Sequence, residues 1–152
     1  MKRTYIITLL LALCSVYTYA QDNFFDKFAE MEGVTSVYIS KTMLSLMPDV
    51  QAEGIKIGEI ASKLDCIRIL SCDKPEIIDQ LKKETSFINP QNGYEELMRI
   101  NDEGEKTTIY LKQNKNGIKE VVLLNNEKED FQLGSITGTL TLKEIQQLVK
   151  KK

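Results

Sequence analysis

The chain has 152 residues, contains no histidine and carries a formal net charge of −2. Without an imidazole it lacks the commonest general base, the Ser-His and Cys-His nucleophile pairs and the commonest metal ligand. The faint negative charge gives no electrostatic reason to bind DNA, RNA or anionic lipid.

Residues 1–20 have the pattern of a cleavable secretory signal. Two basic residues, Lys2 and Arg3, precede an almost wholly apolar run over residues 6–13, and Thr18-Tyr19-Ala20 supplies the small residues that a signal peptidase accepts. The apolar run is far shorter than the roughly 20 residues needed to span a bilayer. We therefore predict cleavage after Ala20 and export to the periplasm or the medium, with no transmembrane segment in the mature chain.

A lipoprotein is the competing interpretation of the same region. Leu11-Ala12-Leu13-Cys14 resembles the box in which the cysteine becomes the lipidated N-terminus. Leu13, however, is bulky where a small residue is expected, and the apolar run would be unusually short. Cleavage after Ala20 is therefore the prediction.

Removal of residues 1–20 leaves 132 of the 152 residues, which is the size of one ordinary domain. Because the removed segment holds two basic residues and no acidic ones, the remainder carries a net charge of −4. A chain of this size buries enough surface to form a core without disulfides or metals. We predict one domain over residues 21–152.

Two cysteines, Cys66 and Cys72, remain in that domain. Residues 65–71 read as a strand, and six residues of strand span about 20 Å at 3.3 Å per residue. Bridged Cα atoms lie within about 7 Å of each other. We predict two buried thiols, and a disulfide is the alternative only if the chain turns back between them.

The first half of this domain alternates helices with strands. The predicted elements are a helix capped by Asp22 that runs to Met31 before Gly33, a strand over residues 35–40, a short helix capped by Ser40 and stopped by Pro48, a helix over residues 55–64, a strand over residues 65–71, and a helix capped by Asp73 and Glu76 with Pro75 in its first turn.

The second half is predicted to be mainly β. The turn pairs Asn89-Pro90 and Asn92-Gly93 precede four strand-like runs, over residues 94–101, 106–113, 118–124 and 131–139. Asn116-Gly117 is a strong hairpin signal, and Gly134 and Gly138 allow β-bulges. A final helix begins with a capping box of Thr141 and Glu144, and Leu140 and Ile145 are placed for a hydrophobic staple.

This order of elements predicts the α+β class rather than a doubly wound parallel sheet. We expect a single two-layer domain. Its sheet is expected to be mixed, with a C-terminal four-strand antiparallel meander and with helices mainly on one face.

Five local segments resemble one known family. They are Phe24-Phe25-Asp26-Lys27-Phe28, the run from Glu32 to Lys41, Ile67-Arg68-Ile69-Leu70, Tyr94-Glu95-Glu96-Leu97-Met98 and Gly138-Thr139-Leu140-Thr141-Leu142. Together they resemble the exported Bacteroidetes proteins gathered as domain of unknown function 4252, over essentially the whole mature chain. The resemblance rests on hydrophobic and turn residues. It implies an exported α+β domain, but no established activity and no site residues.

No group of residues forms a familiar catalytic or metal-binding motif. Ser71-Cys72-Asp73-Lys74 matches the S-x-x-K pattern of serine acyltransferases, but the companion motifs of that class are missing. Neither cysteine has an imidazole to activate it. Glu95 and Glu96 point to opposite faces of a strand, and the acidic turns over residues 102–105 and 125–130 lack the ligand spacing of a calcium loop. We therefore predict no catalytic residue, no cofactor and no metal.

A possible partner-binding face is suggested by the two arginines of the mature chain, Arg68 and Arg99. Each lies between apolar neighbours in a strand-like run, so alternation places it on the face opposite those neighbours. If helices cover only one face, the other displays Arg68, Arg99, Tyr110 and Lys112 together. Arg and Tyr are enriched in binding surfaces. A solvated sheet face is the alternative, and Glu120 is expected on the inner side.

Three functions remain open from the sequence. The first is a non-enzymatic exported domain that binds a protein or a cell-envelope component through the open sheet face. The second is a small-ligand carrier with a pocket between helices and sheet. The third is a hydrolase or transferase of unfamiliar design that uses Ser71 and Lys74 or scattered carboxylates. The first is the prediction.

Overall fold

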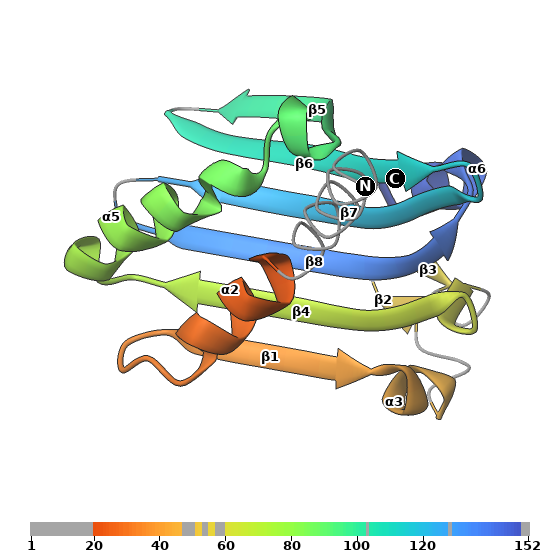
Figure 1. Cartoon of the computed structure of the whole chain (residues 1–152), viewed down its shortest axis with the longest axis horizontal. Coiled ribbons are helices and arrows are strands. Elements are labelled where there is room, and N and C mark those ends of the chain that lie inside the picture. The colour runs from red at the N-terminus through yellow and green to blue at the C-terminus, as the bar shows by residue number, and fades with distance from the viewer. Residues whose placement is uncertain are drawn as a thin grey trace, which may run out of the picture.

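The structure is a computed structural model that describes residues 20–46, 51–52, 55–56, 60–102, 104–127 and 129–149. Its centre is a six-stranded sheet in the order β1-β4-β8-β7-β6-β5, which Figure 1 shows face on. The strands are β1 (Thr35–Ser40), β4 (Leu64–Cys72), β5 (Tyr94–Asp102), β6 (Glu105–Asn114), β7 (Gly117–Asn126) and β8 (Phe131–Leu140), with a separate pair β2 (Gln51–Ala52) and β3 (Ile55–Lys56).

The helices follow and precede the strands along the chain in the order that the sequence predicts. They are α2 (Ala20–Ala29), α3 (Lys41–Ser45), α5 (Pro75–Glu84) and α6 (Leu142–Val149), with short 3-10 turns η1 (Thr85–Phe87) and η2 (Pro90–Asn92). Within the described ranges, no helix is both long enough and apolar enough to cross a membrane.

The prediction of an α+β fold with a C-terminal antiparallel meander, β5 to β8, is confirmed. The prediction of a mixed sheet is wrong, because every neighbouring pair in the six-stranded sheet is antiparallel. The last strand of the meander, β8, returns beside β4 and runs against it, so no parallel pair forms.

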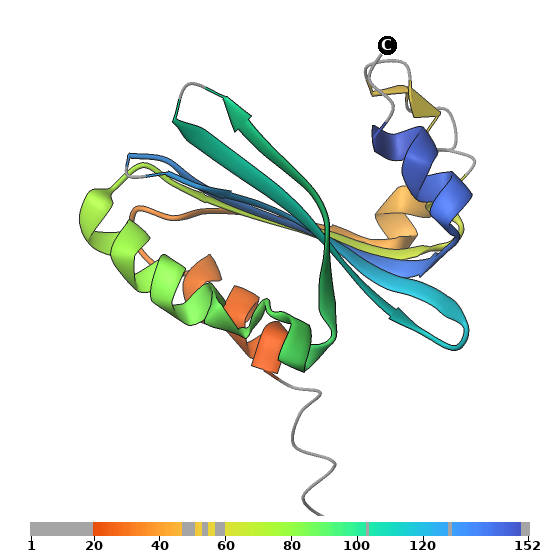
Figure 2. The same cartoon turned by 90° about the horizontal axis from the view of Figure 1, so that it is seen from above.

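Helices lie on both faces of the sheet, so the prediction of helices mainly on one face is also wrong. Figure 2 shows α2 and α5 on one side at one end of the strands, and α3 and α6 on the other side at the opposite end. Two core clusters result. Phe24, Phe28 and Leu81 belong to the cluster on the α2/α5 side, and Leu44 and Ile145 belong to the one on the α3/α6 side.

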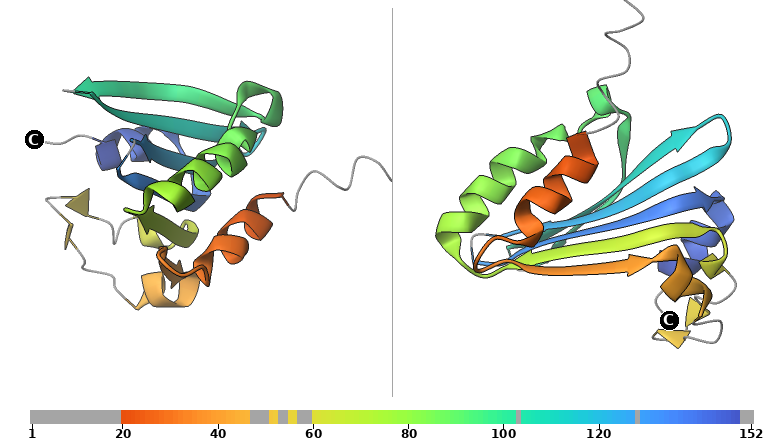
Figure 3. Two further views of the ribbon diagram at one scale, coloured as in Figure 1. Left: turned by 90° about the vertical axis from the view of Figure 1, so that its left-hand side faces the viewer. Right: turned by 60° about the horizontal axis from the view of Figure 1, so that its bottom comes forward.

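This division has a cause in the strands themselves. Along β4, Leu70 and Cys72 face the first cluster, whereas Ile67 packs against the second. A strand that carries apolar side chains on both faces has to be covered on both faces. The right-hand view of Figure 3 shows how the sheet twists between the two groups of helices.

The predicted strands of the main sheet are confirmed, each within two residues of its predicted limits. The Asn116-Gly117 hairpin is confirmed, and Gly117 has a φ of 118°, which favours glycine. The capping box is confirmed as well: Thr141 N donates to Glu144 Oε2 at 2.8 Å, and Glu144 N donates to Thr141 Oγ1 at 3.4 Å. Ser40 caps α3 by accepting a hydrogen bond from Met43 N at 3.3 Å.

Two predicted caps are wrong. The helix α2 begins at Ala20, so Asp22 lies inside it. The N-cap of α5 is Lys74, without a side-chain hydrogen bond, although Pro75 does occupy the first helical position. At α5 the predicted cap, Asp73, is one residue before the N-cap position, and helix limits inferred from sequence are commonly displaced by one or two residues.

The predicted helix over residues 55–64 is wrong at both ends. Residues 55–56 form β3, which pairs with β2, and β4 already begins at Leu64. Ile60 and Ala61 are helical and buried. Short apolar runs fit helix and strand periods about equally well.

Two predictions lie outside the described residues. One is the secretory signal, which falls in residues 1–19, and the other is the helix stop at Pro48.

Candidate binding site

Two rows of apolar residues cross the face of the sheet on which α3 and α6 pack. Strand pairing aligns Val37, Ile69, Gly134, Leu123, Ile109 and Met98 in the first row, and Ile39, Ile67, Ile136, Val121 and Leu111 in the second. We call these residues the apolar face. Val37 and Leu123 are 42% and 37% exposed, so the first row reaches solvent. Contiguous exposed apolar side chains mark interaction sites more often than chance.

A half-open cavity of about 320 Å³ lies on this face. Seven of its ten lining residues are large and apolar: Ile67, Ile69, Ile109, Val121, Leu123, Ile136 and Ile145. The other three are Gln132, Gly134 and Ser135. The volume falls within the range of about 300–1,000 Å³ that is usual for small-molecule sites.

Helix α6 supplies one wall of the cavity through Ile145, which is only 2% exposed. An ion pair between Lys63, just before β4, and Glu144 attaches the helix to the sheet. The hydrogen bond from Lys63, followed by those from Thr141, lowers the pKa of Glu144 to about 2. The wall therefore depends on a carboxylate that stays charged over most of the pH range.

Gln132 and Ser135 are the two polar residues of the cavity lining. The Ser135 hydroxyl points to the opposite face, where it donates to Glu120 Oε1 at 2.5 Å, so Gln132 provides the polar side chain of the lining. Asn125 is the direct cross-strand partner of Gln132. Its Oδ1 is buried and has no hydrogen-bond partner in the part of the chain that the structure describes.

A buried carboxylate, that of Glu120, lies on the face of the sheet opposite the cavity. Glu120 is 3% exposed and accepts hydrogen bonds from Tyr94 Oη at 3.0 Å and from Ser135 Oγ. Burial, then the charge of Glu120 and the hydrogen bond to it, raise the pKa of Tyr94 well above its usual value. These donors satisfy the carboxylate inside the protein, as buried charges require. Glu120 is buried, but the expectation that it lies on the face opposite the arginines is wrong, because its direct cross-strand partner is Lys112.

The four residues of the predicted partner face share one side of the sheet, but it is the side on which α2 and α5 pack. Arg68 lies with its Cζ 5.6 Å from the Phe25 ring of α2. Arg99 forms an ion pair with Glu96. Tyr110 packs against the first core cluster, and Lys112 Nζ lies 4.8 Å from the centre of the Tyr94 ring. Intramolecular contacts therefore engage all four, and a partner role for them stays a prediction.

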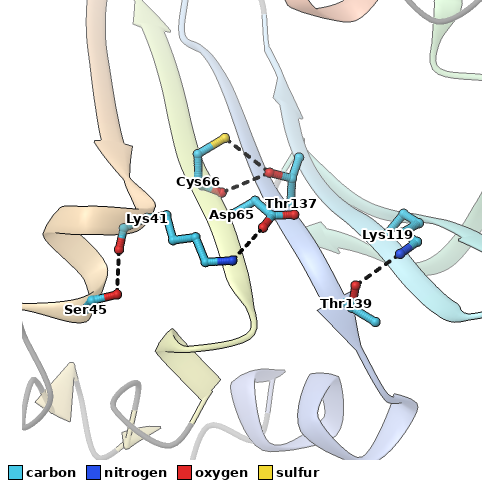
Figure 4. Close-up of polar contacts among 7 residues, drawn as sticks. All are labelled: Lys41, Ser45, Asp65, Cys66, Lys119, Thr137 and Thr139. Atoms are coloured by element: carbon cyan, nitrogen blue, oxygen red, sulfur yellow. Dashed lines mark hydrogen bonds and ion pairs between the residues drawn. The ribbon is translucent and has the colours of Figure 1, made fainter.

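The remaining candidates occupy structural positions. Cys66 and Cys72 are free, buried thiols, as predicted. Cys66 Sγ lies 3.1 Å from Thr137 Oγ1, with Thr137 on the adjacent strand, as Figure 4 shows. Of the S-x-x-K pair, Ser71 is the last but one residue of β4 and Lys74 occupies the N-cap position of α5. Among the described residues, no three Cys, Asp or Glu side chains gather closely enough to hold a metal ion.

The comparison with protein families gives one match. The model of the domain of unknown function DUF4252 covers residues 25–148, which include every strand of the main sheet and the cavity. The chain belongs to the DUF4252 family. No curated protein and no solved structure matches it.

In this DUF4252 chain, reasoning from the sequence missed the apolar face. One signal for it was present: residues 121–124, Val-Val-Leu-Leu, are an unbroken apolar run in β7. Such a run is typical of a strand that is buried on both faces. Alternating strands elsewhere in the sheet led instead to the expectation of one apolar and one polar face.

Proposed function

We propose that this DUF4252 chain is an exported, non-enzymatic domain that binds a small apolar component of the cell envelope, such as an acyl chain, in the cavity on the apolar face. The observation that carries the proposal is the cavity itself, about 320 Å³ in volume and lined mainly by isoleucine, valine and leucine. A pocket of this composition gains affinity by removing apolar surface from water.

The distribution of polar groups supports binding rather than catalysis. No lining residue is ionisable, and general acid–base catalysis needs a titratable group within hydrogen-bond reach of the reacting atom. The buried Glu120 lies on the other side of the sheet and is occupied by Tyr94 and Ser135. An occupant of the cavity would meet apolar contacts and the amide of Gln132.

The test is a fluorescence titration of protein expressed from the full-length chain. The probe is the neutral dye N-phenyl-1-naphthylamine, and 1-decanol is the competitor. We expect saturable binding of one dye per chain and its displacement by the alcohol. A protein that neither enhances the dye fluorescence nor binds decanol would contradict the proposal.

A matched pair of variants locates the site. Leu123→Lys places a charge in the cavity lining and should weaken dye binding by about tenfold or more, because an unpaired ammonium is costly to desolvate. Leu97→Lys is the control: Leu97 is similarly exposed, at 41% against 37% for Leu123, but does not line the cavity. It should leave binding unchanged.

A protein partner is the second candidate. It is favoured by the shared face of Arg68, Arg99, Tyr110 and Lys112, of which Arg99 keeps about half of its side chain exposed, at 47%. Its test is the charge reversal Arg99→Glu in affinity capture from envelope extracts. If the captured proteins are unchanged by this substitution, the partner face loses its support.

A further inference from the structure

The outer edge of β1 lacks the features by which natural sheets prevent strands of different molecules from pairing. β1 is an end strand of the six-stranded sheet, and β4 is its one strand neighbour in the part of the chain that the structure describes. We propose that the β1 edges of two copies of this chain pair antiparallel about a two-fold axis and join the two sheets. This inference goes beyond the proposed function and does not depend on what the cavity binds.

The two end strands of the sheet differ in how well their edges are protected. β5 has a register shift between Glu96 and Met98 and carries four charged side chains. Bulges and charges are the devices that keep an exposed edge from pairing. β1 has six residues, none of them charged and none a proline, and its register with β4 is unbroken. β1 is therefore the edge that can accept another strand.

Exposed apolar side chains are concentrated at the same edge, which is the lower edge of the sheet in Figure 1. Eight large apolar side chains are exposed among the described residues, and four of them fall in the short segment from β1 to the end of α3: Val37, Tyr38, Met43 and Leu46. Tyr38 and Leu46 are the two most exposed of the eight, at 62% and 73%. A cluster of exposed apolar side chains marks an interaction site. An end strand adds to it an outward row of backbone N–H and C=O groups.

The sequence of β1 fits a second copy of itself. An antiparallel pair centred on Tyr38 places the two Tyr38 side chains opposite each other, with Val37 opposite Ile39 and Ser36 opposite Ser40. Aromatic and β-branched cross-strand pairs stabilise a sheet, whereas like charges directly opposite each other destabilise it. This register contains both favourable kinds of pair and no charge. The two-fold axis also forms each contact off the axis twice, as is usual for homodimers.

The same register continues both faces of the sheet. Residues that oppose each other in a ladder lie on one face. Val37 and Ile39 belong to the apolar face, so the apolar rows of the two copies become continuous. Tyr38 lies on the other face, where its cross-strand partner Arg68 has its Cζ 5.7 Å from the Tyr38 ring. The two tyrosines therefore meet while each keeps its contact with the arginine of its own chain.

The first test is sedimentation velocity of the protein expressed from the full-length chain, over about 1–500 µM and without ligand. We expect the mass to move from that of a monomer toward that of a dimer as the concentration rises. A protein that stays monomeric over this range, or that assembles beyond a dimer, would overturn the proposal. Because no ligand is present, this result is independent of the dye titration that tests the proposed function.

A matched pair of variants locates the interface. Val37→Lys places an ammonium opposite Ile39 of the second copy and should raise the dissociation constant of the dimer by about tenfold or more. Leu97→Lys is the control, because Leu97 lies on the opposite end strand, β5, and is 41% exposed against 42% for Val37. It should dimerise like the wild type. If Val37→Lys also dimerises like the wild type, β1 is not the interface.

Cysteine variants test the register. With oxidised glutathione, Tyr38→Cys should form a covalent dimer, because opposed Cα atoms of an antiparallel pair lie about 4.5–5.5 Å apart, which a disulfide can bridge. Val37→Cys should cross-link much less, because the two Val37 positions are diagonal neighbours about 7–8 Å apart. The buried Cys66 and Cys72 are common to both variants, so they do not explain a difference. Cross-linking of Val37→Cys that equals or exceeds that of Tyr38→Cys would contradict the proposed pairing.

Discussion

Tyr94 and Glu120 are joined by a hydrogen bond of 3.0 Å although a whole strand lies between them. Tyr94 begins β5, Glu120 belongs to β7, and Lys112 of the intervening β6 pairs with both. The Lys112 ammonium lies 4.8 Å from the centre of the Tyr94 ring. The three side chains therefore connect the outer strand of the meander to the middle of the sheet.

This connection predicts a specific loss of stability. Tyr94→Phe removes one donor from the buried Glu120 carboxylate and should lower the free energy of unfolding by about 1–3 kcal/mol. Urea denaturation followed by circular dichroism measures the change. Tyr110→Phe is the control, because the Tyr110 hydroxyl makes no hydrogen bond within the described residues. Equal losses in the two variants would contradict a role for the Tyr94–Glu120 bond.

The raised pKa of Tyr94 predicts how stability changes at high pH. Burial and the neighbouring Glu120 keep the phenol neutral above its usual pKa of 10.0. For a group whose pKa is raised on folding, the stabilisation is complete below the unfolded-state pKa and is lost as the pH rises above it. The wild-type protein should therefore lose stability above about pH 10 more steeply than Tyr94→Phe. Parallel curves for the two proteins would show that Tyr94 ionises normally.

The Lys63–Glu144 ion pair predicts an effect at the opposite end of the pH scale. Folding lowers the pKa of Glu144 from 4.5 to about 2, so its stabilisation is present above about pH 4.5 and is lost as the pH falls toward 2. The difference in unfolding free energy between wild type and Glu144→Gln should shrink over that window. The difference should be modest at neutral pH, because Lys63 is partly exposed, at 46%.

Two glycines of β8 predict opposite outcomes for the same substitution. A Cβ at Gly138 would lie 2.4 Å from the Lys63 carbonyl oxygen, whereas one at Gly134 would meet only Leu123 Cβ at 3.9 Å. Gly138→Ala should therefore cost about 1–3 kcal/mol of stability through overpacking. Gly134→Ala should fold normally and weaken dye binding, because Gly134 lines the cavity. Thermal melts and the dye titration measure the two effects, and similar melting temperatures for both variants would refute the first.

The predicted secretory signal gives an expected N-terminus for the mature protein. Cleavage after Ala20 would leave Gln21 as the first residue, and the first described buried residues, Phe24 and Phe25, would be retained for the core. N-terminal sequencing of protein recovered from the periplasm or medium should begin at Gln21. A lipidated Cys14 in the membrane fraction would instead support the competing lipoprotein interpretation.

Local sequence determined most of the secondary structure of this protein. The strand over residues 35–40, the Asn116-Gly117 hairpin and the Thr141–Glu144 capping box all depend on residues within a few positions of one another. Such short-range signals can be read before the fold is known. The helix predicted over residues 55–64 failed because its apolar spacing also suits a strand, and pairing with β2 decided between them.

Only the tertiary structure decided which face of the sheet each helix covers. Alternation correctly placed Arg68 and Tyr110 on the side opposite Ile69 and Ile109, but it carries no information about where α2, α5 and α6 pack. That choice depends on contacts between residues far apart in the chain, such as Phe25 with Arg68 and Ile145 with the apolar face. The cavity and the buried Asn125 acceptor follow from the same long-range packing, so neither could be read from the sequence.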